Sequence, residues 1–393
     1  MKVVVAIDSF KGSLTSMQAG FAAKEGIEKV CNANVVVKPL ADGGEGTTDA
    51  LIEGLGGRMI ELSVTGPMGT KVKAAYGILS DGKTAVMEMA QAAGIILVDR
   101  KKLNPWKATT VGVGEMILDA AARGCREFMI GIGGSATTEG GIGMLSALGY
   151  QFLDEAGNIL EPVFSSLDKI ASINESKVPA VLKDCYFQIA CDVTNPLCGK
   201  YGAVYVFGPQ KGVKPEEKEI MDQMMSKYAK SIADFTGSDY STVPGTGAAG
   251  GLGFAFLSMV PNVTLKSGIQ IVLEAIDLEK ELADADIVIT GEGRLDFQTA
   301  MGKVPVGVAR LAKKHGCTVL AFAGEVTDDA GECNFHGIDA FFPIVRGVCT
   351  LDEAMDTETA RKNMSLSIEQ VFRLLYASPD KVKKTQVYQQ KLN

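Results

Sequence analysis

Short apolar runs alternate with helix-like segments at both ends of this sequence. Near the N-terminus, apolar runs at 3–7 and 35–40 each lead through a polar loop into a helix-like segment, at 16–30 and at 47–55. Beyond about residue 286 the alternation returns, with strand-like runs at 287–290, 318–323 and 340–344 and helix-like segments at 304–315 and 358–376. This alternation is typical of an α/β fold with a doubly wound parallel sheet, which binds ligands at the carboxyl ends of its strands.

The middle of the chain has a different pattern. Runs at 72–79 and 84–89 flank Ser80-Asp81-Gly82-Lys83, which predicts a β-hairpin with an Asp-Gly turn. Further strands are expected at 127–132, 187–190 and 203–207. We therefore expect a second α/β domain with a mixed sheet, inserted into the first. Residues 1–62 and 266–393 would form a discontinuous Rossmann-like domain, residues 63–265 the inserted domain, and the active site would lie in the cleft between them.

Composition excludes several classes of protein. A hydrophobic content of 46% with 22% charged residues describes an ordered globular chain. The net charge of −8 argues against nucleic-acid binding, which needs a basic surface. The eight cysteines show neither a CxxC pair nor zinc-ligand spacing, so reduced thiols are expected. The apolar run before Asp8 is too short for a signal peptide, which favours a cytoplasmic location.

The longest uncharged stretch, 240–265, is long enough in principle to span a bilayer. Its glycines and prolines favour a loop followed by a buried helix at 252–259 instead, so no membrane association is expected. The sequence leaves the oligomeric state open, a homodimer being one option.

A glycine-rich loop, GIGGSATTEGGIG at 131–143, follows one strand-like run and precedes a helix-like one. In this order, backbone N–H groups and a helix N-terminus can face a bound phosphate or carboxylate. A long turn would use the same glycines, but loops mixing glycine, hydroxyl and carboxylate recur at 41–47, 245–251 and 290–294. The glycines and hydroxyls expected to bind nucleotide phosphates are Gly43, Gly44, Gly133, Gly134, Ser135, Thr137, Gly247 and Gly250.

Two acids, Asp42 and Glu45, stand among the glycines of the loop at 41–47. Carboxylates there would repel a bare phosphate, but they suit a phosphate that carries Mg²⁺. The loop therefore indicates a metal–nucleotide site. We expect Asp42, Glu45 and Asp296 to include the metal ligands.

Other charged residues also follow strand-like runs. Asp8 and Lys11 come after the first run, Asp192 after the run at 187–190, and Arg294 after the run at 287–290. A helix cap would explain the neighbouring Ser9 and Ser13 without function, and an Asx-turn would explain Asp192. A further lysine, Lys211, lies in the segment FGPQKG.

Of two nucleotide-binding patterns, the P-loop is rejected and the GxGxxG is a weak indication, because neither has the right structural context. Residues 77–84 match the P-loop letters but lie on the expected hairpin, and the GxGxxG at 245–250 does not follow a strand. His315 and His336 are both expected to be structural, so a hydrolytic triad is a poor interpretation. The candidate groups that remain are carboxylates, lysines, an arginine and the backbone N–H groups of loops. These are the groups that phosphoryl transfer uses.

Taken in order, these segments resemble the bacterial type I glycerate kinases, and the similarity extends from Met1 to about Tyr376. It rests on DSFKGSL (8–14), ADGGEGT (41–47), GIGGSAT (131–137), CDVTNPLCG (191–199), FGPQKG (207–212), GTGAAGGLG (245–253) and TGEGRLDFQT (290–299). The resemblance implies ATP and Mg²⁺ as cofactors, D-glycerate as the small-molecule substrate and its 2-hydroxyl as phosphoryl acceptor. Thr138 and Glu139 stand where the family pattern is usually Asn-Asp, which could move a metal or hydroxyl contact.

The roles expected from this resemblance divide into three groups. Asp8 or Asp192 would deprotonate the attacking hydroxyl, while Lys11, Lys211 and Arg294 would pair with the substrate carboxylate and the transferring phosphate. Ser9 and Ser13 would contact the substrate. A glycerate 3-kinase, a kinase of another small hydroxy or sugar acid, and a non-catalytic nucleotide or organic-acid sensor remain as alternatives.

Overall fold

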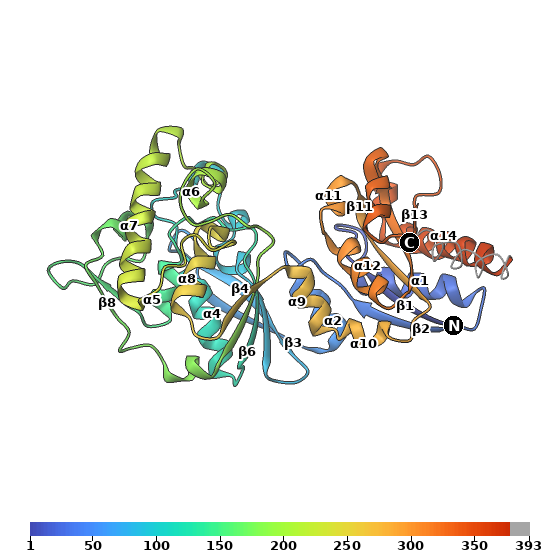
Figure 1. The fold of residues 1–393 in the computed structure, drawn as a ribbon, viewed down its shortest axis with the longest axis horizontal. Coiled ribbons are helices and arrows are strands. Elements are labelled where there is room, and N and C mark those ends of the chain that lie inside the picture. The colour runs from blue at the N-terminus through green and yellow to red at the C-terminus, as the bar shows by residue number, and fades with distance from the viewer. Residues whose placement is uncertain (378–393) are drawn as a thin grey trace. The chain divides into compact units, whose positions relative to one another are not determined.

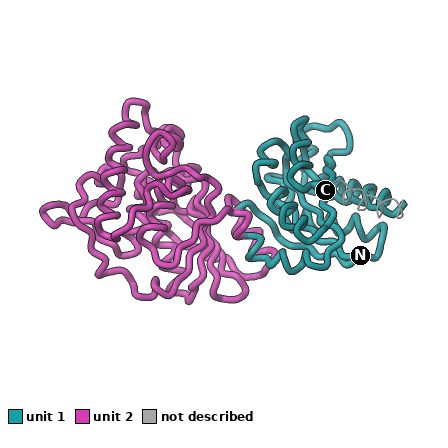
Figure 2. The backbone as a smooth tube through the Cα atoms, viewed as in Figure 1, with its two compact units in different colours: residues 1–42, 272–393 teal, residues 43–271 magenta. Residues whose placement is uncertain are grey.

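The computed structural model describes residues 1–377, which divide into two compact units (Figures 1 and 2). The first comprises Met1–Asp42 with the chain from Val272 onward, and the second comprises Gly43–Ile271. The boundaries expected at 62/63 and 265/266 differ from these. Helix α2 (Thr47–Leu55) packs against strands β4 (Lys71–Leu79) and β5 (Thr84–Glu88) of the second unit, and β3 (Gly57–Thr65) pairs with β4 over its whole length. The unbroken strand–helix alternation up to residue 55 gave no sign of this change.

The first unit is built on a five-stranded sheet in which every neighbouring pair is parallel. Its strands are, in spatial order, β13 (Ala340–Pro343), β12 (Thr318–Val326), β11 (Ile287–Leu295), β1 (Lys2–Ile7) and β2 (Asn34–Pro39). From β1 the chain goes to β2 on one side, whereas β11 lies on the other. This is the flavodoxin-like order of the doubly wound fold, and the reversal between β1 and β11 is where such sheets bind ligands.

Helices cover this sheet because the strands of a parallel sheet are buried on both faces. Helix α1 (Ser16–Glu28) packs against α14 (Thr357–Ala377), and both share an apolar cluster with β1, β11 and β12 (Figure 1). Helix α12 (Val304–Lys314), whose buried residues lie outside that cluster, packs against β11 and β12. The shorter helices of this part are α10 (Leu278–Leu282), α11 (Phe297–Ala300) and α13 (Leu351–Met355), and α9 (Gly268–Ala275) crosses the boundary between the units.

The second unit contains a six-stranded mixed sheet. Its strands are, in spatial order, β10 (Val263–Lys266), β9 (Tyr186–Ala190), β6 (Glu127–Gly131), β5 (Thr84–Glu88), β4 (Lys71–Leu79) and β3. The first four are parallel, and β5, β4 and β3 are antiparallel, so the expected hairpin and mixed sheet are confirmed. A small second sheet pairs β7 (Gln151–Leu153) with β8 (Ser172–Asn174).

The core of the second unit is larger and rich in aromatic side chains. Phe128 of β6 and Phe187 of β9 stack with their ring centroids 4.8 Å apart. Both lie in an apolar cluster to which the surrounding helices contribute. The helices of this unit, besides α2, are α3 (Ala90–Ala93), α4 (Val111–Ala122), α5 (Ile142–Ala147), α6 (Ala203–Phe207), α7 (Lys218–Thr236) and α8 (Leu252–Met259).

The strand expected at 203–207 was wrong, because this segment is helix α6. Its run Ala-Val-Tyr-Val-Phe is apolar and partly β-branched, and so short a run does not separate a strand from a buried helix. The uncharged stretch 240–265 forms the expected loop and helix, α8, and then enters β10, a strand that the sequence did not predict. Within residues 1–377, no helix has the length and apolar character of a membrane span.

Candidate active site

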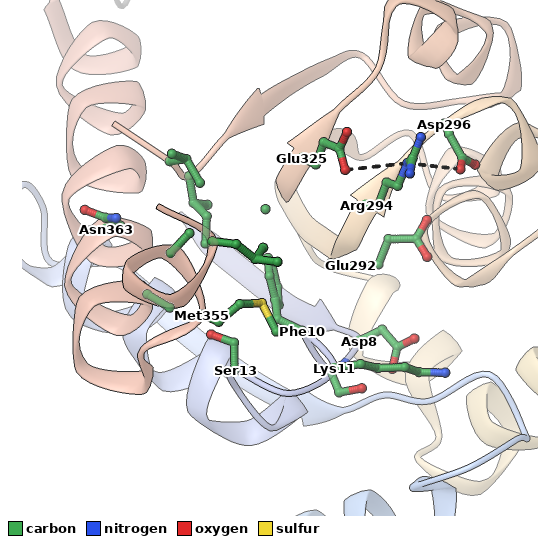
Figure 3. A pocket seen from close by; sticks show the side chains of 18 of the residues that line it. Asp8, Phe10, Lys11, Ser13, Glu292, Arg294, Asp296, Glu325, Met355 and Asn363 are labelled. Atoms are coloured by element: carbon green, nitrogen blue, oxygen red, sulfur yellow. Dashed lines mark hydrogen bonds and ion pairs between the residues drawn. The ribbon is translucent and has the colours of Figure 1, made fainter. Parts of the chain in front are cut away.

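A pocket of about 540 Å³ opens in the first unit at the carboxyl ends of β1, β11 and β12 (Figure 3). One wall is the loop that follows β1, from Asp8 to Ser13, and the facing wall includes Glu292, Arg294 and Asp296. The backbone N–H of Asp8 donates to the carbonyl oxygen of Gly291 at 2.9 Å, which fixes the loop against β11. The pocket therefore lies at the strand-order reversal of the sheet.

Asp8 is the most buried acid of this pocket, with 6% of its surface exposed. Burial raises its pKa to about 7, and the negative charge of Asp42 adds to this effect, whereas a hydrogen bond from the Ser9 N–H and the charge of Lys11 oppose it. Burial also raises the pKa of Glu292, which accepts a 2.5 Å hydrogen bond from the Thr299 hydroxyl. A carboxylate that titrates near neutral pH can exchange a proton with a substrate hydroxyl.

Lys11 and Arg294 reach the same pocket from opposite walls, and Lys303 lines it as well. Lys11 Nζ lies 3.7 Å from an oxygen of Asp42, and Arg294 Nε lies 3.6 Å from Asp296 and 3.7 Å from Glu325 (Figure 3). The Lys11 and Arg294 side chains are 64% and 59% exposed. Ion pairs this exposed contribute little to stability, so both cations can turn toward an anionic ligand at small cost.

Two predicted site residues of this pocket have distinct surroundings. Asp296 begins α11, where its Oδ1 accepts from the N–H groups of Gln298 and Thr299 while its Oδ2 faces Arg294. Both of its oxygens thus have protein partners. The Ser13 hydroxyl is buried and makes no hydrogen bond within the described residues, so a ligand could satisfy it.

In the second unit, the two predicted glycine loops lie against each other. The N–H of Gly140 donates to the carbonyl oxygen of Gly250 at 2.8 Å, and a Cβ on Gly250 would approach the carbonyl oxygen of Thr137 to 2.2 Å. Gly247 is buried, and its N–H donates to the carbonyl oxygen of Asn195. Gly133 and Gly134, by contrast, are exposed. The first loop therefore has exposed glycines at its start, and the second is used largely for packing.

Lys211 lies inside the second unit, with 1% of its surface exposed. Its ammonium donates to Ser135 Oγ at 2.7 Å and to the Thr137 carbonyl oxygen at 2.6 Å, so it holds the glycine loop from within. Burial lowers the pKa of Lys211, and the charge of the nearby Glu139 opposes this effect. Its expected contact with substrate stays a prediction.

Buried acids occupy the starts of two helices that the sequence offered as anion sites. Glu139 accepts from the N–H of Gly143 at 3.0 Å, in the first turn of α5. Glu88, at the end of β5, accepts from the N–H groups of Gly46 and Thr48 at the start of α2. These two helix starts therefore face internal carboxylates, which changes the expectation drawn from the glycine loops.

The remaining predicted residues of the second unit lie near the start of α9 or on the surface. Asp192 Oδ1 accepts from the N–H of Gly268, the first residue of α9, at 2.9 Å. Gly43 has a φ of +85°, and a Cβ there would lie 2.4 Å from the Cα of Gly268, so packing alone requires glycine. Gly44 and Glu45 follow directly, and Glu45 is exposed.

Sequence reasoning missed Glu88 and Glu292. Glu88 ends an otherwise uncharged strand, and a lone acid at that point was a usable signal. Glu292 lies within the segment TGEGRLDFQT, but β11 extends to Leu295, five residues beyond its expected end, and this places Glu292 on the strand beside Asp8 in the pocket.

The carboxylates of the pocket fit a magnesium ion that arrives with phosphates. In the described chain, no cluster of three or more His, Cys, Asp or Glu side chains is arranged to hold a metal by itself. Mg²⁺ does not need one, because it keeps several waters and takes one or two carboxylates beside substrate phosphates. Asp42 raises the pKa values of both Asp8 and Glu292, a repulsion that a divalent cation would relieve.

Comparison with known proteins shows which family the chain resembles. The model of the glycerate kinase family matches residues 3–376. The chain belongs to the glycerate kinase family. It is 46% identical to a glycerate 2-kinase of Escherichia coli, over 90% of this chain and 93% of the relative. It is 45% identical to a glycerate kinase of Bacillus subtilis, over 91% and 93%.

The fold has a solved counterpart as well. A crystal structure of a Salmonella typhimurium protein shares 43% identity and superimposes with a TM-score of 0.89, covering 96% of this chain and 99% of that one. The resemblance to the glycerate kinase family and the α/β fold class expected from the sequence are therefore confirmed.

Proposed function

We propose that this kinase transfers the γ-phosphoryl group of ATP to the 2-hydroxyl of D-glycerate, giving 2-phospho-D-glycerate and ADP. Membership of the glycerate kinase family and the name of the Escherichia coli relative support the substrate and the hydroxyl. The observation that carries the chemistry is Asp8, a buried acid with a pKa of about 7 at the strand-order reversal, beside Lys11.

In the proposed reaction, the oxygen of the glycerate 2-hydroxyl forms a bond to the γ-phosphorus of ATP. The Asp8 carboxylate accepts the proton that this hydroxyl loses. The bond between that phosphorus and the oxygen bridging to the β-phosphate breaks, and its electron pair leaves with ADP. Lys11 and Arg294 pair with the glycerate carboxylate and the transferring phosphoryl group. Asp192 is the weaker candidate for the base, because it is exposed and one of its oxygens accepts from the start of α9.

Asp42, with Glu292 beside it, would hold Mg²⁺, which supplies neutralisation of the phosphate charges. Glu45 and Asp296 are less suited: Glu45 does not line this pocket, and both oxygens of Asp296 have partners. Ser9 and Ser13 line the pocket and would contact the substrates. The exposed Gly133 and Gly134 remain the best-placed glycines for phosphate binding. No membrane-spanning helix occurs in residues 1–377, and we propose that the enzyme works in the cytoplasm.

One assay tests this assignment. Pure protein is incubated with Mg·ATP and D-glycerate, and product is detected by coupling to enolase, which uses the 2-phospho isomer. We expect an immediate signal. A signal that needs added phosphoglycerate mutase would instead identify a 3-kinase, ATP consumption with other hydroxy acids only would shift the substrate, and no ATP consumption with any acid would leave a sensor.

A further inference from the structure

The pocket of the first unit has two chemically different ends. The charged end carries Asp8, Lys11, Glu292 and Arg294. The other end is apolar and lies between the loop after β1 and the segment that contains α13 and the start of α14 (Figure 3). The apolar end is lined by Phe10, Ile344, Leu351, Ala354, Met355 and Ala360.

We propose that the apolar end binds the adenine base of the nucleotide, so that the base lies against α13 and the phosphates extend toward Lys11 and Arg294. This rests on the proposed function only in taking ATP as the phosphoryl donor. It gives the nucleotide an orientation that the glycine loops of the second unit did not suggest.

The volume of the pocket suits a nucleotide. A volume of about 540 Å³ falls in the range of pockets that enclose drug-sized ligands, and a three-carbon acid would leave most of it empty. Because the apolar and charged ends belong to one pocket, a single ligand with an apolar head and an anionic tail fits it best. A nucleoside triphosphate has that shape and charge distribution.

The construction of the apolar end is the second argument. Phe10 is buried and fixed by two backbone hydrogen bonds with Leu14, so its ring is a rigid wall. Gly12, at a φ of +81°, lets the Met355 side chain lie directly above it, where a Cβ would approach Met355 Cε to 2.9 Å. Methionine sulfur makes favourable contacts with aromatic rings and adapts to their shape. A flat aromatic base thus meets one rigid and one adaptable surface.

Polar groups at this end provide the third argument. Asn363 of α14 lines the pocket, and within residues 1–377 its amide makes no hydrogen bond. An asparagine amide presents one donor and one acceptor side by side, which pairs with the adjacent acceptor and donor of adenine N7 and N6. The unpartnered hydroxyl of Ser13 lies on the same side of the pocket, near Met355 (Figure 3). These groups give an apolar pocket the means to select its base.

Ala354→Leu tests the location of the base, because leucine would fill the space assigned to it. Ala283→Leu, the same substitution at an exposed position of the first unit outside the pocket, is the matched control. Binding of ADP and of inorganic tripolyphosphate is measured by calorimetry with Mg²⁺ and without glycerate. We expect Ala354→Leu to weaken ADP binding at least tenfold and to leave tripolyphosphate binding and the KM for D-glycerate unchanged. Ala283→Leu should behave as wild type. Unchanged ADP binding in a folded Ala354→Leu protein would overturn the proposal.

Asn363→Leu provides a second test that leaves the pocket volume nearly unchanged. We expect the preference for ATP over GTP, measured as the ratio of kcat/KM values or of dissociation constants, to fall at least tenfold. A preserved ratio would show that Asn363 does not contact the base.

The two proposals fail in different ways. ADP binding that depends on Ala354, in a protein that does not phosphorylate glycerate, would remove the proposed substrate and keep the base site. Glycerate phosphorylation with ADP binding indifferent to Ala354→Leu would keep the function and remove the base site.

Discussion

Replacing Asp8 with asparagine should abolish turnover and at the same time stabilise the protein. The side chain is almost fully buried, and its pKa of about 7 replaces an ordinary value of 3.8. The folded state therefore binds this proton more tightly than the unfolded chain does. The stability from this group is present in full below pH 3.8 and is lost as pH rises to about 7.

The expected magnitude follows from these two values. At pH 8 the wild-type protein must ionise Asp8 in the folded state, which costs about 4 kcal/mol relative to the unfolded chain. At pH 5 the folded state keeps the proton, and the cost falls to about 2 kcal/mol. Asparagine retains an oxygen for the Ser9 N–H and carries no charge. Asp8→Asn should therefore raise the free energy of unfolding of the first unit by up to these amounts.

The assay is denaturant unfolding of both proteins at pH 5 and pH 8, paired with turnover of D-glycerate. Loss of a general base typically costs 10²- to 10⁴-fold in rate, and wild-type kcat/KM should fall about tenfold per pH unit below pH 7. Asp328→Asn, which changes an exposed acid of the same unit, is the control and should alter neither quantity. Equal stability of Asp8→Asn and wild type at pH 8, or full turnover by the variant, would refute the reasoning.

Three further predictions concern other parts of the molecule. Lys211→Met should destabilise the second unit by about 1–3 kcal/mol for each of two acceptors, the Ser135 hydroxyl and the Thr137 carbonyl oxygen, because both lose their buried donor. Adding Glu139→Gln should recover part of that loss in a double-mutant cycle, because the two charges interact; simple additivity would argue against this coupling. Gly250→Ala should cost more than Gly237→Ala in urea unfolding, since both have positive φ but only Gly250 meets a backbone oxygen, and equal costs would contradict this. Asp42→Ala should raise the Mg²⁺ concentration needed for half-maximal turnover at least tenfold, with an unchanged requirement counting against that ligand.

Much of the fold could be predicted because it depends on local signals. Apolar runs of period and length typical of buried strands identified the parallel sheet, and the Asp-Gly turn identified the hairpin of β4 and β5. The boundary of the second unit could not be found this way. The sequence of α2 is that of any amphipathic helix, and only its packing partners β4 and β5 assign it to the second unit.

The site was predictable in its residue types and less so in their surroundings. Asp8, Lys11 and Arg294 were predicted because charged residues directly after apolar strands are conspicuous, and all three line the pocket. Lys211 was predicted from the same kind of signal but is buried, because acceptors supplied by the distant residues Ser135 and Thr137 surround its ammonium. Sequence position shows where a charge occurs along the chain, whereas burial depends on contacts between remote segments.

Glu88 and Glu139, which accept hydrogen bonds at the starts of α2 and α5, affect where the protein can bind anions from solution. A glycine-rich loop before a helix is usually interpreted as a binding site for an external anion. Here the side-chain carboxyl groups of the protein occupy that position. N–H groups at the starts of these helices already donate to internal acceptors, so phosphate or sulfate from solution has little to gain there. In the first unit, an anion that competes with substrate would therefore meet the pocket cations Lys11, Arg294 and Lys303, which makes simple inhibition by such ions a report on that pocket.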